Sequence, residues 1–120
     1  MNRGLVKNYV AGGPIKPHSI VAVGLADFEV IQATTADDPI IGICMQPGGA
    51  AEGERVDIGH SGIVEVVAAG TISAGAPVTA TADGAAVEAT PGGGSRVIGH
   101  AQIAAASGDI VPVLIGLSTI

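Results

Sequence analysis

The fold is decided by the stretch Gly70-Thr71-Ile72-Ser73-Ala74-Gly75-Ala76-Pro77-Val78, which repeats the pattern of an earlier one. The earlier stretch is Gly13-Pro14-Ile15-Lys16-Pro17-His18-Ser19-Ile20-Val21, and the shift from position 13 to position 70 is 57 residues. The same shift, without a gap, places Val10 on Val67, Val30 on Val87 and Gly42 on Gly99. Because repeated supersecondary units bury their apolar faces against one another, the sequence predicts an internal duplication.

Short runs of β-branched residues alternate with turns that contain glycine and proline from Ser19 onward, which is typical of an all-β barrel or sandwich. The predicted strands cover residues 20–23, 28–33, 40–45, 54–58, 63–68, 77–81, 85–89, 96–103 and 109–115. The dipeptide Asp83-Gly84 indicates a tight hairpin, because such turns need a positive φ at both central residues. Ala26-Asp27, at the corresponding place in the first unit, lacks the glycine and predicts a looser hairpin.

The predicted domain organisation is an N-terminal arm over residues 1–12 and a single β domain over residues 13–120. Two related β-units, about 13–58 and 70–115, make up that domain. The arm contains residues with strand propensity, among them Leu5, Val6 and Tyr9, but no short turn ties it to a neighbour. Its pairing partner lies in another chain or, as a plain first strand, in the domain's own sheet. The sequence leaves both alternatives open.

Composition limits the classes of function. Of the 120 residues, 48% are hydrophobic, yet the aromatic residues are only Tyr9 and Phe28. A core of Val, Ile and Ala gains less per side chain than one with aromatics, so association with other chains is favoured. The net charge of −6, with five Lys and Arg residues, disfavours direct nucleic-acid binding. The longest run without charge, residues 66–82, is too short and too interrupted for a membrane helix.

Candidate catalytic and metal-binding motifs are incomplete. Gly59-His60-Ser61-Gly62, close to Asp57, resembles a nucleophile elbow, but Ile63 stands where that motif requires glycine. The Gly92-Gly93-Gly94 run lacks the Lys and the following helix of a phosphate loop. His18, His60 and His100 show no metal-ligand spacing, and the acidic runs 37–38 and 52–57 do not match a calcium loop. Cys44 lies in an apolar run and is expected to be buried and inert. We therefore expect no catalytic residue, no cofactor and no metal, so the chain is not expected to be an enzyme.

Several stretches, in their order and spacing, resemble tailed-phage head decoration proteins, which are also called capsid cement proteins. They are Lys7-Asn8-Tyr9-Val10, the stretch 70–78, Val97-Ile98-Gly99-His100-Ala101 and Ala104-Ala105-Ala106-Ser107-Gly108-Asp109. The resemblance covers nearly the whole chain. It implies a compact β-tulip or β-clip fold and a homotrimer at three-fold and quasi-three-fold positions on the outside of an expanded capsid.

The resemblance also implies a partner and a location. The partner is the major capsid protein, and the location is the outer capsid surface of the virion, after synthesis in the host cytoplasm. In that family an N-terminal segment orders on the shell by strand pairing with capsid protein, which is a recurring mode of recognition. Carried over to this sequence, the capsid-binding arm comprises Arg3, Leu5, Val6, Lys7, Asn8 and Tyr9.

A second function remains open from the sequence. The segment Gly12-Gly13-Pro14-Ile15-Lys16-Pro17 is similar to parts of β-clip domains that bind sugars or small carboxylates. The alternative to a structural virion protein is therefore a small β-clip-type ligand-binding or enzyme module.

Overall fold

A computed structural model describes residues 6–24, 26–36, 38–89 and 95–119. In these ranges the regular structure is ten β-strands and one 3₁₀ turn, η1 (Ala82–Gly84). The strands are β1 (Val6–Ala11), β2 (Ile20–Val23), β3 (Glu29–Gln32), β4 (Ile40–Cys44), β5 (Arg55–Gly59), β6 (Ile63–Val67), β7 (Pro77–Ala80), β8 (Ala86–Glu88), β9 (Arg96–Ala101) and β10 (Ile110–Thr119). The predicted all-β fold is confirmed.

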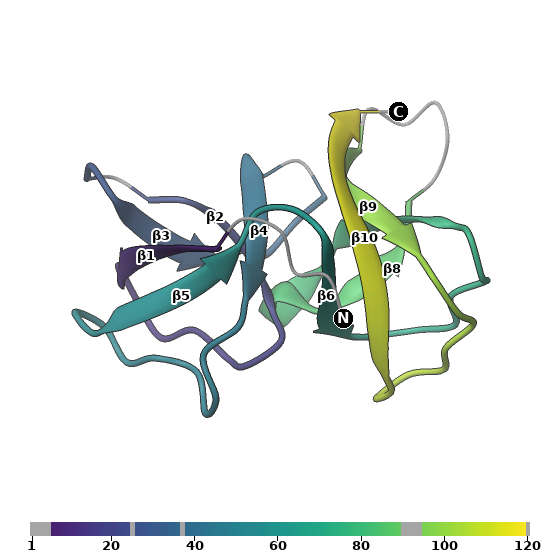
Figure 1. Cartoon of the computed structure of the whole chain (residues 1–120), viewed down its shortest axis with the longest axis horizontal. Coiled ribbons are helices and arrows are strands. Elements are labelled where there is room, and N and C mark those ends of the chain that lie inside the picture. Colours follow the sequence, from purple (N-terminus) through teal and green to yellow (C-terminus); the bar gives the residue numbers. More distant parts are fainter. Residues whose placement is uncertain (1–5, 25, 37, 90–94, 120) are drawn as a thin grey trace.

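The strands form two sheets that lie side by side (Figure 1). The first is a closed barrel in the order β1-β3-β2-β4-β5, and the second is a five-stranded sheet in the order β6-β10-β9-β7-β8. We number the strands of each sheet from one to five in chain order. Both sheets then have the same order of neighbouring strands, which is third, second, fourth, fifth, first. The bridges Ile15 to Ala50 and Ile72 to Ala105 occupy corresponding places. The duplication itself stays a prediction, and this shared order is the observation that supports it.

The strand boundaries follow the turn residues closely. Eight of the nine predicted strands match an observed strand to within two residues at each end, because β-branched runs stop at glycine, proline and aspartate. The exception is β10, which continues to Thr119 rather than stopping at residue 115. Its pairing with β9 resumes there after an irregularity between Ile115 and Ser118.

An extended arm is not confirmed for residues 6–11. They form β1, which pairs with β5 from Val6 opposite Gly59 to Val10 opposite Arg55. The physical reason is that the apolar end of β1 completes the barrel, where Ala11 is buried. The second alternative, a first strand in the domain's own sheet, therefore describes these residues. Residues 1–5 lie outside the described part of the chain.

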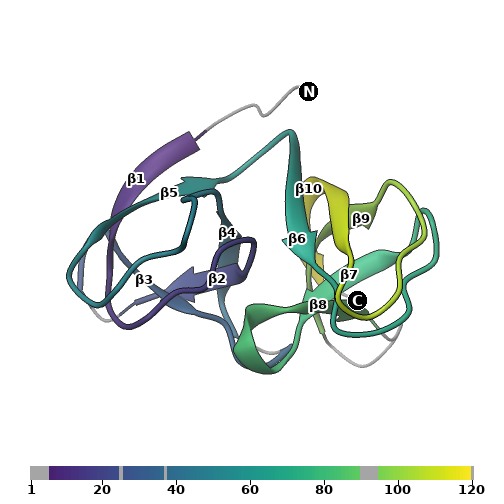
Figure 2. The same cartoon turned by 90° about the horizontal axis from the view of Figure 1, so that it is seen from below.

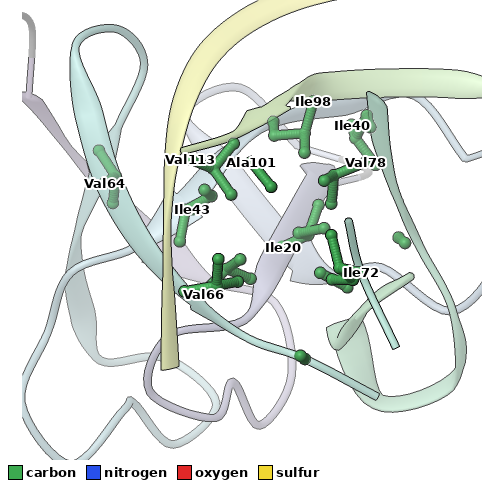
Figure 3. Close-up of a cluster of buried hydrophobic side chains, with 14 of the residues drawn as sticks. Ile20, Ile40, Ile43, Val64, Val66, Ile72, Val78, Ile98, Ala101 and Val113 are labelled. Carbon is green, nitrogen blue, oxygen red and sulfur yellow. The ribbon is translucent and has the colours of Figure 1, made fainter. Parts of the chain in front are cut away.

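Two clusters of buried side chains hold the sheets. One fills the barrel and includes Val21, Val30 and Ile58. The other fills the second sheet and also includes residues from the outside of the barrel, Ile20 and Ile43 among them. Figure 3 shows Ile20 and Ile43 pointing into the same cluster as Val66 and Val78. The second cluster is therefore a core that the barrel and the second sheet share.

The hairpin at Asp83-Gly84 has the backbone conformation that its sequence predicts. Asp83 has a φ of 64° and Gly84 a φ of 70°. The turn packs against the barrel, because a Cβ atom on Gly84 would lie 2.9 Å from the Ile20 carbonyl oxygen. Asp83 Oδ2 also lies 3.5 Å from Lys16 Nζ, across the junction between the two sheets. The loop of the first hairpin is one residue longer, since Val23 pairs with Val30 whereas Ala80 pairs with Ala86.

Candidate binding edge of β1

The described residues of the predicted site lie on one strand. Val6, Lys7, Asn8 and Tyr9 belong to β1, whereas Arg3 and Leu5 fall outside the described part of the chain. Figure 2 shows β1 beside β5, on the side of the barrel away from β9. Along its other side β1 pairs with β3 only at its C-terminal end, where Val10 and Ala11 lie opposite Glu29 and Val30.

The N-terminal half of β1 is a strand edge. The Val10 amide donates to the Phe28 carbonyl at 2.9 Å, on the β3 side. Backbone groups alternate along a strand, so the Asn8 N–H and C=O point to that same side. The Met45 amide donates to the Asp57 carbonyl at 2.9 Å, so the backbone of Asp57 faces β4 rather than Asn8. Among residues 6–24, 26–36, 38–89 and 95–119, none pairs with Val6 to Asn8 on this side, which we call the open edge of β1.

The side chains of β1 divide into two sets. Val6 is 39% exposed, and Lys7 and Asn8 are exposed as well. Asn8 Nδ2 donates to Asp57 Oδ1 at 3.1 Å, which adds a side-chain link between β1 and β5. Val6 and Lys7 are therefore the side chains of this strand that an incoming partner can reach most directly.

Tyr9 is turned toward the protein instead. Its side chain packs on the barrel core, and its hydroxyl lies 2.6 Å from His60 Nε2. His60 Nδ1 lies 3.0 Å from the Ile41 carbonyl, which can only accept, so Nδ1 carries the hydrogen and Nε2 accepts from the Tyr9 hydroxyl. Tyr9 thus links β1 to the segment that joins the two sheets. The place of Tyr9 in the predicted capsid-binding arm stays a prediction.

An exposed aromatic residue that the sequence did not single out lies beside the open edge. Phe28, whose carbonyl accepts the Val10 amide, is 76% exposed and has a φ of 58°. A bulky side chain in this conformation is uncommon, because a positive φ raises the free energy of the folded backbone. The feature of the sequence that indicates this exposure is the position of Phe28 in a turn, between Asp27 and the first residue of β3. Val23, 49% exposed at the end of β2, lies on the same barrel.

The motif Gly59-His60-Ser61-Gly62 connects β5 to β6. The segments on both sides are strands, as the sequence predicts, and not the strand and helix of a nucleophile elbow. The hydrogen-bond partners of His60 are Tyr9 and Ile41. The role that the structure gives His60 is therefore structural.

The other candidate groups in the sequence were Cys44 and the possible metal ligands. Cys44 is buried, and burial raises the pKa of its thiol, which disfavours the reactive thiolate. In the described ranges, no three His, Cys, Asp or Glu side chains gather closely enough to hold a metal ion. The helical segments within the same ranges include none with the length and apolar character to cross a membrane.

A cavity of about 270 Å³ lies at the junction of the two sheets. Its lining is mostly apolar, with Lys16 and Asp83 as its charged residues, and comprises Lys16, Pro17, His18, Ser19, Val67, Ala69, Ala82, Asp83 and Ala85. The contact between Lys16 and Asp83 joins the part of the lining that precedes β2 to the part in the turn between β7 and β8.

Comparison with known proteins gives three findings. The structure resembles the N base of the head fiber gp8.5 of bacteriophage phi29, with a TM-score of 0.69 and 22% sequence identity over 97% of each chain. At that identity the likeness shows a shared fold. No curated protein matches the sequence. The family model of phage cement proteins matches residues 1–117. The chain therefore belongs to the phage cement protein family, a family of structural virion proteins that associate with the capsid.

Proposed function

We propose that this protein binds the outside of an expanded phage capsid as a homotrimer, at three-fold and quasi-three-fold positions, and stabilises the shell. The observation that carries the proposal, beyond membership of the family, is the open edge of β1 with exposed Phe28 beside it. Its partner is an extended segment of the major capsid protein. The role of Val6, Lys7 and Asn8 in this contact is part of the proposal.

A strand edge suits this task for a physical reason. Its unpaired N–H and C=O groups pair with an added strand and need no particular side-chain sequence. Side chains next to the edge then supply contact area, and Phe28 and Val6 are placed to do so. A single copy holds the shell weakly through so short an edge. Three edges in one trimer act together, since the second and third contacts become intramolecular.

The experiment compares Asn8→Pro with Asn8→Ala. Proline removes the amide on the open edge and is tolerated at a strand edge whose N–H faces outward. Alanine removes the Asp57 contact but keeps the amide. We expect Asn8→Pro to lower the affinity for expanded capsids by about tenfold or more, and Asn8→Ala to change it by less than about threefold. Cosedimentation with expanded capsids measures both, and circular dichroism checks that both variants fold.

Each alternative result has a definite meaning. Wild-type affinity in Asn8→Pro would contradict pairing along β1, and equal loss in both variants would assign binding to the Asn8 side chain instead. Removal of residues 1–9 is a poorer test, because it deletes most of β1 and opens the barrel.

A second candidate function is favoured by the cavity at the sheet junction. Its lining includes Lys16 and Pro17, from the segment that resembles sugar- and carboxylate-binding domains, and Lys16 is a cation that a small carboxylate could pair with. A ligand at 100 times its Kd would raise the free energy of unfolding by about 2.7 kcal/mol. A thermal-shift screen of sugars and small carboxylates tests this candidate, and no shift across the panel would count against it.

A further inference from the structure

The cavity at the junction of the two sheets, of about 270 Å³, has a cation and an anion at its exposed rim. Lys16 Nζ lies 3.5 Å from Asp83 Oδ2, and the two side chains are 64% and 70% exposed. Exposed pairs of this kind contribute little to stability, so a ligand can separate them at small cost. The lining behind the pair is apolar and includes Val67, Ala82 and Ala85.

The backbone that carries each charge is held in place. The Lys16 amide donates to Gln32 Oε1 at 2.8 Å, and the Lys16 carbonyl accepts from the hydroxyl of buried Ser19 at 2.7 Å. Asp83 has a φ of 64° in η1, which packs against the barrel through Gly84. Figure 1 shows this turn between the barrel and the second sheet. Because the two points of attachment are fixed, little order has to be created when a ligand binds between the charges.

The size and the lining of the cavity limit its ligands. Sites for drug-sized ligands have volumes of about 300–1,000 Å³, so this cavity suits a smaller molecule. The Ser19 hydroxyl already donates to the Lys16 carbonyl. The hydroxyls of a sugar would therefore meet mostly valine, alanine and proline side chains and would lose hydrogen bonds to water. A small ligand with an apolar body and a charged end fits this lining better.

The ion pair decides which charges that end carries. A carboxylate that binds Lys16 displaces Asp83 and leaves the Asp83 carboxylate without the Lys16 cation. The net charge of the chain, −6, adds repulsion against any anion. A ligand that also carries an ammonium group replaces both halves of the pair, because its carboxylate binds Lys16 and its ammonium group binds Asp83.

We infer that this cavity binds a zwitterionic α-amino acid with an apolar side chain of about the size of leucine. The side chain of the ligand lies against Val67, Ala82 and Ala85, and its two charged groups lie between Lys16 and Asp83. The inference rests on the second candidate function and names the ligand class of that site.

The test is a nitrogen-15 NMR titration of the full chain with L-leucine, isocaproate and isoamylamine. The three ligands share one apolar body, but isocaproate lacks the ammonium group and isoamylamine lacks the carboxylate. We expect L-leucine to shift the amide signals of Val67, Ala82 and Ala85 saturably, with a Kd of about 1 mM, and the other two to bind about tenfold or more weakly. Glycine should bind about a hundredfold or more weakly than L-leucine, since each buried methylene strengthens binding by about fourfold.

Three variants test the two charges. Lys16→Met keeps most of the side-chain stem, and Asp83→Asn keeps the turn because asparagine tolerates a positive φ. Each should weaken L-leucine binding by about fivefold or more. Lys7→Met is the matched control, because it removes the same charge as Lys16→Met from β1, whose residues do not line the cavity. It should keep the wild-type Kd.

The outcomes that overturn the inference are distinct from those that concern the proposed function. Equal affinities for L-leucine and isocaproate would overturn the zwitterionic ligand and leave a carboxylate site in place. No saturable shift with either ligand at about 10 mM would remove both. Wild-type affinity for L-leucine in Lys16→Met and Asp83→Asn, with spectra that show both variants folded, would also contradict the inference. Capsid binding is measured separately, with Asn8→Pro.

Discussion

At the scale of single residues, Asp38 shows what a loop charge does in this fold. Asp38 Oδ2 accepts hydrogen bonds from the Thr34 amide at 2.7 Å and the Thr35 amide at 3.1 Å, and the hydroxyls of both threonines donate to its carboxylate. These bonds, above all the one from the Thr34 amide, lower the pKa of Asp38 below its usual value. The carboxylate therefore organises the turn that precedes β4.

Replacement of Asp38 by alanine should lower the free energy of unfolding by about 1 kcal/mol at pH 7. The folded state favours the carboxylate, so this stabilisation is complete above the ordinary aspartate pKa of 3.8. It disappears as the pH falls below that value and through the lower pKa of the folded state. Urea unfolding of wild type and Asp38→Ala at pH 7 and at about pH 2.5 measures the difference. An equal difference at both pH values would contradict this role.

At the scale of elements, β4 and β9 each contain a glycine that a neighbouring strand approaches closely. A Cβ atom on Gly42 would collide with the Gly59 carbonyl oxygen and would lie 2.6 Å from Ile58 Cγ2. A Cβ atom on Gly99 would collide in the same way with the Leu114 carbonyl oxygen. Both glycines lie where the pairing of the strand is irregular or changes partner. The sequence match between these two positions therefore corresponds to the same steric requirement in both sheets.

We expect Gly42→Ala to destabilise the protein by about 2 kcal/mol or more, since the obstructing atoms include backbone that cannot move independently. Gly13→Ala is the matched control, because a Cβ atom there has no neighbour within 4 Å. It should change the free energy of unfolding by less than about 1 kcal/mol. Thermal and urea unfolding compare the two, and equal stability of both variants would show that β4 can shift away from β5.

The elements could be predicted better than their pairing. Runs such as Ile40 to Cys44 are readable because the signal, β-branched residues between turn residues, is local. The pairing of β1 with β5 is not local: Tyr9 and His60 are 51 positions apart, and no turn connects the two strands directly. The open edge exists only because β3 begins opposite Val10, which is a detail of barrel closure. Phe28 escaped prediction because its exposure follows from a left-handed backbone that aromatic residues seldom adopt.

At the scale of the whole molecule, the shared core should make the barrel and the second sheet unfold together. Ile43 is fully buried between them, and Ile43→Ala should cost about 2–4 kcal/mol and keep a single transition. Ile103→Ala, at a site that is 51% exposed, should cost less than about 1 kcal/mol. Fluorescence of Tyr9, which lies in the barrel, and far-ultraviolet circular dichroism should give the same midpoint. Separate midpoints would show that the two sheets unfold independently.

The point at which β3 meets β1 has one more consequence. A guest strand added to β1 stops where Glu29 lies opposite Val10, so its usable length is the stretch from Val6 to Tyr9, about 13 Å. An edge this short pairs with one added strand per copy, which makes binding saturable. It also distinguishes poorly between the sequences of added strands. A protein that holds its shell in this way tolerates drift in the coat sequence, provided that the coat still displays an extended segment of that length.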